Sequence, residues 1–286
     1  MTSGNQQLKI AFIGGGNMAS ALISGLAGKL TAGANIRVID PNPAALEALH
    51  AQFGVDTAPS MAVGLAGFDV IVLAVKPQSM REVAAQLLPQ LTACLEHGGQ
   101  PLILSIAAGI RGIDLSRWLG GYSAIVRCMP NTPALIGLGI TGMVAAGTVS
   151  TQQKQAADAI MSAVGATVWL LDETLIDPVT AVSGSGPAYV FYFIEAMQQA
   201  ALEMGLSNEQ GTQLALATFV GAAQLAAQST DPVALLRERV TSKGGTTHAA
   251  LVCMEQAGVK QAIVDAVKAA AQRGKELGEQ LGADQD

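Results

Sequence analysis

The feature that most constrains the fold of this chain is a series of short apolar segments that alternate with helical patterns. Seven segments have the length and apolar character of buried strands: 8–13, 36–39, 70–75, 102–106, 124–128, 140–146 and 167–171. Apolar residues recur at helical spacing between them, in 18–27, 43–52, 79–91, 113–119 and 151–164. Because strands that alternate with helices form βαβ units, the pattern predicts an α/β fold with a parallel, doubly wound sheet.

The pattern changes after about residue 172, and from there apolar residues keep helical spacing to the end of the chain. Short breaks interrupt it, and Ser207 and Asp231 fit the N-cap positions of the helices that follow. Pro232 stands where the first helical residue is expected. We therefore expect an α/β domain in residues 1–171 and an all-helical domain in residues 172–286.

The first expected strand runs directly into Gly14-Gly-Gly-Asn-Met-Ala19 and then into a helix. This is the G-x-G-x-x-A form of the dinucleotide-binding fingerprint. Gly14 permits the tight turn, Gly16 lets a pyrophosphate approach the backbone, and Ala19 lets helix and strand pack closely. Asn17 and Met18 open the helix, whose free N–H groups and dipole favour phosphate. The strand–turn–helix context predicts that residues 1–171 form a Rossmann-like nucleotide-binding domain.

Asp40 ends the second expected strand, about twenty residues past the fingerprint, where an acidic side chain would hydrogen-bond a ribose 2′-hydroxyl. That role favours NAD over NADP. The alternative is that Asp40 caps the turn in Asp-Pro-Asn-Pro. Arg37 lies on the same strand and could bind a 2′-phosphate if the loop bent back, so the choice between NADPH and NADH stays open.

The segment Ala74-Val75-Lys76-Pro77 follows another expected strand. It would lie at the carboxyl edge of the sheet, where ligands bind in open α/β folds. We expect all four residues near the coenzyme, with Lys76 beside the nicotinamide ribose or a phosphate. A solvated lysine at a strand end is the alternative.

Five motifs then occur in a distinctive order: Phe12-Ile-Gly-Gly-Gly-Asn-Met-Ala19, Ala74-Val-Lys-Pro-Gln78, Arg127-Cys-Met-Pro-Asn-Thr-Pro133, Ala181-Val-Ser-Gly-Ser-Gly-Pro-Ala-Tyr189 and Val240-Thr-Ser-Lys-Gly-Gly-Thr-Thr247. Together they resemble the pyrroline-5-carboxylate reductases, over essentially the whole chain. The resemblance implies a Rossmann domain followed by a helical dimerisation domain. It also implies NAD(P)H-dependent reduction of 1-pyrroline-5-carboxylate, a cyclic imine carboxylate, to L-proline, by a homodimer or an assembly of dimers.

The resemblance places the substrate pocket where the nicotinamide meets the helical domain at the dimer interface. Met129 and Pro130 are implied to contact the substrate, and Asn131 the coenzyme. The other implied substrate contacts are Gly244, Gly245, Thr246 and Thr247. The chain departs from the family at Lys243, where proline is expected, and this change bears on the stiffness of the loop.

Elementary chemistry points to the same loop. Gly244 to Thr247 open an expected helix, so free N–H groups converge where a carboxylate is favoured, although an ordinary helix cap would use the same residues. Reduction of a protonated C=N bond needs orientation and a supply of protons. Because a threonine hydroxyl is a poor acid, Thr247 is assigned positioning and relay at the imine nitrogen.

Composition narrows the possible partners. A net charge of −6 with no basic run argues against nucleic acid. Half of the chain is hydrophobic, but glycine, proline or polar residues break its uncharged stretches, so we expect subunit interfaces and no membrane span. Cys94, Cys128 and Cys253 have no metal-site spacing, which predicts buried thiols in a reducing compartment and no metal. Residues 1–7 lack the regions of a secretion signal, so a cytoplasmic location is expected.

Two other functions compete with reduction of an imine. A two-domain hydroxy-acid dehydrogenase would need a lysine or histidine base, for which Lys243 is the obvious candidate in the second domain. A non-catalytic NAD(P)-binding regulator would need no site for a carboxylate. A Thr247→Ala variant should keep coenzyme binding in every case and lose turnover if the imine interpretation is right.

Overall fold

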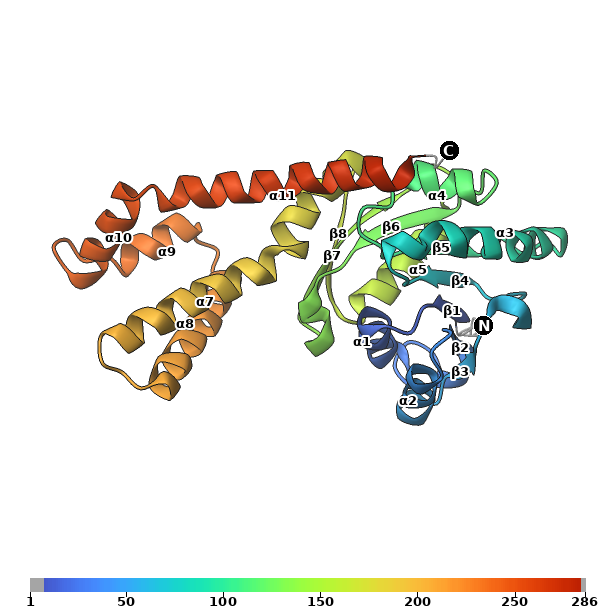
Figure 1. Ribbon diagram of the computed structural model, residues 1–286, viewed down its shortest axis with the longest axis horizontal. Coiled ribbons are helices and arrows are strands. Elements are labelled where there is room, and N and C mark those ends of the chain that lie inside the picture. Colours follow the sequence, from blue (N-terminus) through green and yellow to red (C-terminus); the bar gives the residue numbers. More distant parts are fainter. Residues whose placement is uncertain (1–7, 284–286) are drawn as a thin grey trace. The chain divides into compact units, whose positions relative to one another are not determined.

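Figure 1 shows the structure of this protein, which is a computed structural model and describes residues 8–283. Within those residues, eight strands form one sheet in the order β3-β2-β1-β4-β5-β6-β7-β8. The strands are β1 (Ile10–Ile13), β2 (Ile36–Ile39), β3 (Asp56–Ala58), β4 (Val70–Leu73), β5 (Leu102–Ser105), β6 (Ile125–Met129), β7 (Gly139–Ala145) and β8 (Gly165–Trp169). The predicted α/β class with a doubly wound sheet is confirmed.

One pair of strands breaks the expected parallel order. β7 is antiparallel to β6, whereas β8 is again parallel to β7. The connection from Met129 to Gly139 holds a short 3-10 helix, Thr132–Ile136, and is shorter than the dozen or so residues that a parallel crossover needs. The chain therefore returns beside β6 in the opposite direction.

Helices cover both faces of the sheet (Figure 1). They are α1 (Asn17–Leu26), α2 (Pro43–Phe53), α3 (Met80–Glu96), α4 (Gly112–Trp118) and α5 (Thr151–Ser162). Leu22 of α1 and Ile160 of α5 join the apolar core on one face, and Leu87 of α3 and Leu115 of α4 join the core on the other. Every residue of β1, β4 and β5 is buried, which explains why these strands read as continuous apolar runs.

The seven expected strands are all present, with ends within two residues of the expected ones. β3 was missed, because Asp-Thr-Ala has no apolar alternation that would mark it as a strand. It exists through tertiary pairing: Arg37 of β2 lies opposite Asp56 in the register, and their side chains form an ion pair of 2.6 Å.

From Glu173 to the end of the described chain the backbone is helical, as predicted. The elements are a 3-10 turn (Glu173–Leu175), α6 (Ile176–Val179), a π-helical turn (Thr180–Gly184), α7 (Gly186–Glu203), α8 (Asn208–Gln228), α9 (Val233–Arg239), α10 (Thr246–Gln256) and α11 (Val259–Gly282). Ser207 caps α8 as expected, with its hydroxyl accepting from Gln210 N–H in a capping box. The expectation for Asp231 is wrong: Pro232 is the N-cap of α9, and the Asp231 carboxylate pairs with Arg239.

The chain divides into two compact units. The sheet unit runs to Ser185 and includes the chain from Ala270 onward, and the helical unit spans Gly186–Ala269. The expected division at 171/172 falls just after β8, but the sheet unit continues through the π-helical turn. The end of α11 belongs to it because Gly278 packs on Gly109, and Gly282 C=O accepts a hydrogen bond from Arg117.

Two of the three cysteines are buried, Cys94 and Cys128, and burial raises the pKa of the Cys128 thiol. Cys253 is exposed, so the expectation of a buried thiol is wrong there; α10, which carries it, has no buried residue in the described chain. None of the helices within residues 8–283 is both long enough and apolar enough to cross a membrane. The segment 1–7, on which the expectation about a secretion signal rests, lies outside the described residues.

Candidate active site

The fingerprint loop forms a cradle at the carboxyl end of β1. Gly14 has φ +103°, a conformation that side chains rarely adopt, and a Cβ there would stand 2.6 Å from Ala74 O. Gly16 is the N-cap of α1 and receives no side-chain hydrogen bond, and a Cβ there would meet nothing within 4 Å. The start of α1 therefore has open space at Gly16 and no side-chain cap, and a dinucleotide pyrophosphate requires both.

The predicted coenzyme segment Ala74–Pro77 lies beside this loop. β4 ends at Leu73, and Ala74 N–H donates to Ile13 O at 2.8 Å, which brings the segment Ala74–Pro77 beside Gly14. Lys76 is exposed at the start of a 3-10 turn. Gly14, Gly16, Ala74 and Lys76 thus share one edge of the sheet, although they lie some sixty residues apart in sequence.

Asp40 has a structural task in this cradle. Its Oδ2 accepts a hydrogen bond of 2.8 Å from Gly15 N–H, and its Oδ1 accepts one of 2.8 Å from Asn42 N–H. The alternative that Asp40 caps its own turn is confirmed, and the same carboxylate ties that turn to the fingerprint loop. Its contact with a ribose hydroxyl stays a prediction.

Arg37 is committed elsewhere. Its Nε donates to Asp56, its Nη1 donates to Gly64 O at 3.2 Å, and its guanidinium lies 5.1 Å from the centre of the Phe68 ring. These contacts hold the side chain on the β3 side of the sheet. A role for Arg37 in binding a 2′-phosphate stays a prediction.

The loop after β6 packs on the π-helical turn. Asn131 is 9% exposed; its Oδ1 accepts from Ile140 N–H at 2.9 Å, and its Nδ2 donates to Ser183 O at 3.1 Å. Met129 reaches the same turn, because a Cβ on Gly184 would stand 2.6 Å from the Met129 methyl carbon. The Asn131 side chain is thus bonded to the protein itself, and its expected contact with the coenzyme stays a prediction.

A charge cluster around the buried Arg127 of β6 was missed from the sequence. Arg127 is 5% exposed in β6, and its Nη1 donates to Glu173 Oε1 at 2.8 Å. The same oxygen accepts from Gly112 N–H at 2.6 Å. Burial raises the pKa of the nearby Asp177, and this effect exceeds the opposing attraction of Arg127. A single arginine inside an otherwise apolar strand is the one sequence signal that could have revealed this cluster.

The residues implied to bind substrate in the helical unit form the start of α10. Gly244 has φ +74°, and Gly245 is the N-cap with no side-chain cap bond. Thr246 and Thr247 are the first two helical residues, and both are exposed in the single chain. The backbone N–H groups of this helix start are therefore available to an anion.

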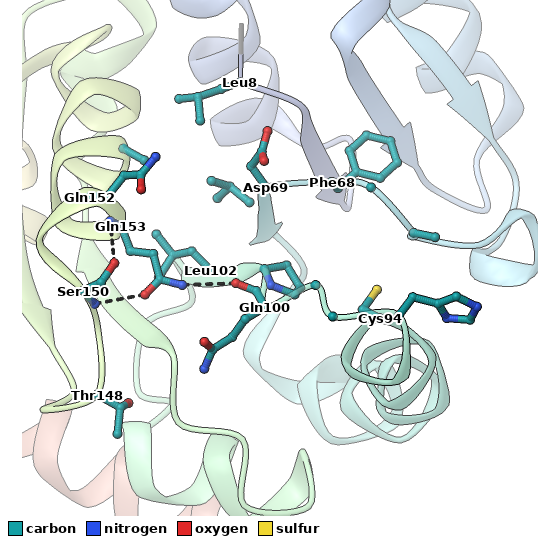
Figure 2. A pocket seen from close by; sticks show the side chains of 18 residues that line it. Leu8, Phe68, Asp69, Cys94, Gln100, Leu102, Thr148, Ser150, Gln152 and Gln153 are labelled. Atoms are coloured by element: carbon teal, nitrogen blue, oxygen red, sulfur yellow. Dashed lines mark hydrogen bonds between the residues drawn. The ribbon is translucent and has the colours of Figure 1, made fainter. Parts of the chain in front are cut away.

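A separate hollow lies at the opposite, amino edge of the strands (Figure 2). Its lining includes Phe68, Asp69 and Cys94, and across it Gln153 donates to Gln100 O at 3.2 Å. Asp69 already accepts a hydrogen bond from Lys9 N–H, and no lysine or arginine of the described chain lines the hollow.

Comparison with known proteins supplies the family. The chain is 46% identical to the pyrroline-5-carboxylate reductase of Pseudomonas aeruginosa over 274 residues, which cover 96% of this chain and 98% of that protein. This chain belongs to the pyrroline-5-carboxylate reductase family. The enzyme of Escherichia coli is 36% identical over 271 residues and is covered to 98%. The family described as pyrroline-5-carboxylate reductase dimerisation matches residues 173–277, and the one described as NADP oxidoreductase coenzyme F420-dependent matches residues 9–108.

Solved structures of pyrroline-5-carboxylate reductases have the same fold. The protein from Coxiella burnetii has a TM-score of 0.88 at 38% identity, covering 95% of this chain and 99% of that one. The Plasmodium falciparum enzyme, solved with NADP bound, has a TM-score of 0.82 at 30% identity, covering 96% and 99%. Membership of this family does not favour the hydroxy-acid dehydrogenase or the regulator.

Proposed function

We propose that this protein reduces 1-pyrroline-5-carboxylate to L-proline with NADPH or NADH. The observation that carries the proposal is the 46% identity to the Pseudomonas aeruginosa reductase along nearly the whole of both chains. The fingerprint cradle supports it, because Gly16 and the start of α1 leave room for a pyrophosphate. When bound, the coenzyme supplies the hydride that reduces the C=N bond.

On the coenzyme side, this chain's residues bind and orient. The first N–H groups of α1 would hold the pyrophosphate, with Lys76 beside it at the same edge. NADP in the Plasmodium falciparum structure supports NADPH as one coenzyme of this family. Asp40 would repel a 2′-phosphate that came close, which supports NADH as well.

On the substrate side, the start of α10 would receive the carboxylate. Gly244 and Gly245 expose the backbone, and the N–H groups of Thr246 and Thr247 have no intrahelical acceptor at this position. The Thr247 hydroxyl would hydrogen-bond the ring nitrogen and relay a proton to it. Met129 and Pro130 would form the apolar wall of the pocket.

We also propose a homodimer or an assembly of dimers located in the cytoplasm, with no nucleic-acid partner. The match to a dimerisation family over 173–277 supports the assembly. The exposed apolar side chains of the helical unit agree with it, since Phe191 is 65% and Tyr192 is 73% exposed in the single chain.

The test is the oxidation of NADPH and of NADH, followed by loss of absorbance, when 1-pyrroline-5-carboxylate is added to the purified protein. Turnover with either coenzyme supports the proposal, and the ratio of the two kcat/KM values reports the influence of Asp40. A folded protein that binds NADPH but oxidises neither coenzyme would overturn it.

The Thr247→Ala variant tests the substrate side of the proposal. It should lower kcat/KM for the imine by about 100-fold, a typical effect of removing a positioned proton-transfer group, and leave NADPH affinity unchanged. Thr247→Ser keeps the hydroxyl and should retain most of the activity. Thr92→Ala is the matched control, because Thr92 is an exposed threonine of α3 whose hydroxyl donates to Leu88 O of its own helix.

A further inference from the structure

The π-helical turn leaves one backbone carbonyl without its usual partner. In an α-helical pattern Ser183 O would accept from the N–H of residue 187, but that residue is proline and has no N–H. Asn131 fills the place, since its Nδ2 donates to Ser183 O at 3.1 Å from 52 residues away. Single π-helical turns inside helices often occur at functional sites.

Asn131 is held firmly enough to act as a clamp. Its Oδ1 accepts from Ile140 N–H at the start of β7, and its backbone carbonyl accepts from Ala134 N–H at 3.1 Å. The side chain is 9% exposed. One carboxamide therefore joins the loop after β6, the start of β7 and the π-helical turn.

Gly184 lies next to Ser183, and the side chain of Met129, from the end of β6, packs against it. A Cβ at Gly184 would stand 2.6 Å from the Met129 methyl carbon but 3.7 Å from its next neighbour, Thr180. The atom in the way is the far end of a flexible side chain. An alanine at 184 would thus displace the Met129 methyl and leave the backbone in place.

We propose that Asn131 is a positioning residue, and that Gly184 makes the space which sets where the Met129 side chain stands in the substrate subsite. This inference rests on the proposed function, which assigns Met129 to the wall of the imine pocket. The turn and the loop then form one unit that determines how the five-membered ring fits beside Met129.

The contact itself can be tested without turnover. The chain has ten methionines, and their methyl groups can be observed by ¹³C NMR, with Met129 assigned from a Met129→Leu variant. Gly184→Ala should shift the Met129 methyl resonance. Gly147→Ala is the control, because a Cβ at this exposed residue meets nothing within 4 Å, and it should shift none. An unmoved Met129 signal in Gly184→Ala would overturn the inference.

Kinetics test the consequence for substrate. Gly184→Ala should raise KM for the imine about tenfold, the scale of one misplaced methyl group in an apolar pocket, and leave KM for NADPH within about twofold. In a Met129→Ala background the same substitution should change KM less than about twofold, because the clashing group is gone. Equal effects in both backgrounds would contradict the inference.

A second double-mutant cycle, with Asn131 and Pro187, tests the hydrogen bond from Asn131 to Ser183 O. Asn131→Asp keeps an acceptor for Ile140 N–H but turns an oxygen toward Ser183 O, and should lower kcat/KM for the imine about tenfold. Pro187→Ala gives Ser183 O a backbone donor of its own, so the loss caused by Asn131→Asp should shrink at least about threefold in that background. Strictly additive effects would exclude the clamp. If the wild-type protein shows no turnover, the proposed function fails; if it turns over normally and both cycles are additive, this inference alone fails.

Discussion

The two units of the molecule differ in how far their apolar side chains are buried. In the sheet unit, β1, β4 and β5 are buried along their whole length, and Phe12 and Leu22 are 0% exposed. In the helical unit, α9 and α10 have no buried residue within the described chain, and Phe191 of α7 is 65% exposed. One unit has a complete core, whereas the other exposes large apolar side chains in the single chain, as surfaces that form subunit interfaces do.

This difference separates two kinds of stability. A completed core stabilises a single chain at any protein concentration, whereas apolar faces that are covered by a second copy contribute only after assembly. The coenzyme cradle belongs to the first kind and the start of α10 to the second. We therefore expect coenzyme binding to survive changes that abolish assembly and imine reduction.

The largest expected effect on stability comes from replacing one phenylalanine in each unit with alanine. Phe12→Ala should lower the free energy of unfolding by about 3–5 kcal/mol, because it empties a buried site between sheet and helices. Phe191→Ala should leave the unfolding of the sheet unit unchanged and weaken assembly. Urea denaturation at two protein concentrations measures the loss of stability, and sedimentation measures the loss of assembly. Equal losses of stability in both variants would break the comparison.

Two glycines of the fingerprint allow a comparison within the sheet unit, between a glycine with a crowded backbone and a glycine with open space. Gly14→Ala forces an alanine into φ +103° against Ala74 O and should cost roughly 3 kcal/mol of unfolding free energy. Gly16→Ala has open space and should change stability by less than about 0.5 kcal/mol. Both should weaken NADPH binding, as measured by quenching of protein fluorescence. A Gly16→Ala protein that binds NADPH normally would contradict the cradle.

The end of α11 tests how that helix is held to the sheet unit. A Cβ at Gly282 would clash with the Asp114 carboxylate, which is buried and paired with Arg111, so Gly282→Ala should cost about 1–2 kcal/mol. At Gly274 the nearest atom, Asp177 Oδ1, would be 3.5 Å away. Gly274→Ala should therefore be neutral or slightly stabilising, since alanine favours a helix. Thermal denaturation of the two variants gives the comparison.

The smallest effect is a dependence on pH at Asp177. Burial raises its pKa above the ordinary value of 3.8, and this effect outweighs the attraction of Arg127, the largest of the charge effects; Glu173 and Glu279 act in the raising direction and Lys275 in the lowering one. The folded state therefore holds this proton more tightly than the unfolded one, so the contribution of Asp177 to stability falls as pH rises from about 4. Asp177→Asn should gain stability relative to wild type at neutral pH and not below pH 4. A difference that is the same at both pH values would contradict the raised pKa.

The strands and the nucleotide loop could be read from the sequence because their signals are local. Apolar runs such as 70–73 mark a strand that is covered on both faces, and Gly14 and Gly16 mark a turn through their own backbone freedom. The same reasoning could not find β3, whose three residues carry no apolar alternation. Nor could it show that a Cβ on Gly14 would stand 2.6 Å from Ala74 O, in a segment sixty residues away.

What the sequence determined by itself is thus the α/β class, the position of the fingerprint loop and the helical second half, because each of them is marked by a local pattern of residues. The tertiary structure decided the rest: Asp40 ties its own turn to Gly15, Arg37 pairs with Asp56, and Asn131 holds Ser183. Each of these polar groups could have found several partners. The packing of segments tens of residues apart chose among them, because a buried donor or acceptor must bond to whatever group the fold brings within about 3 Å.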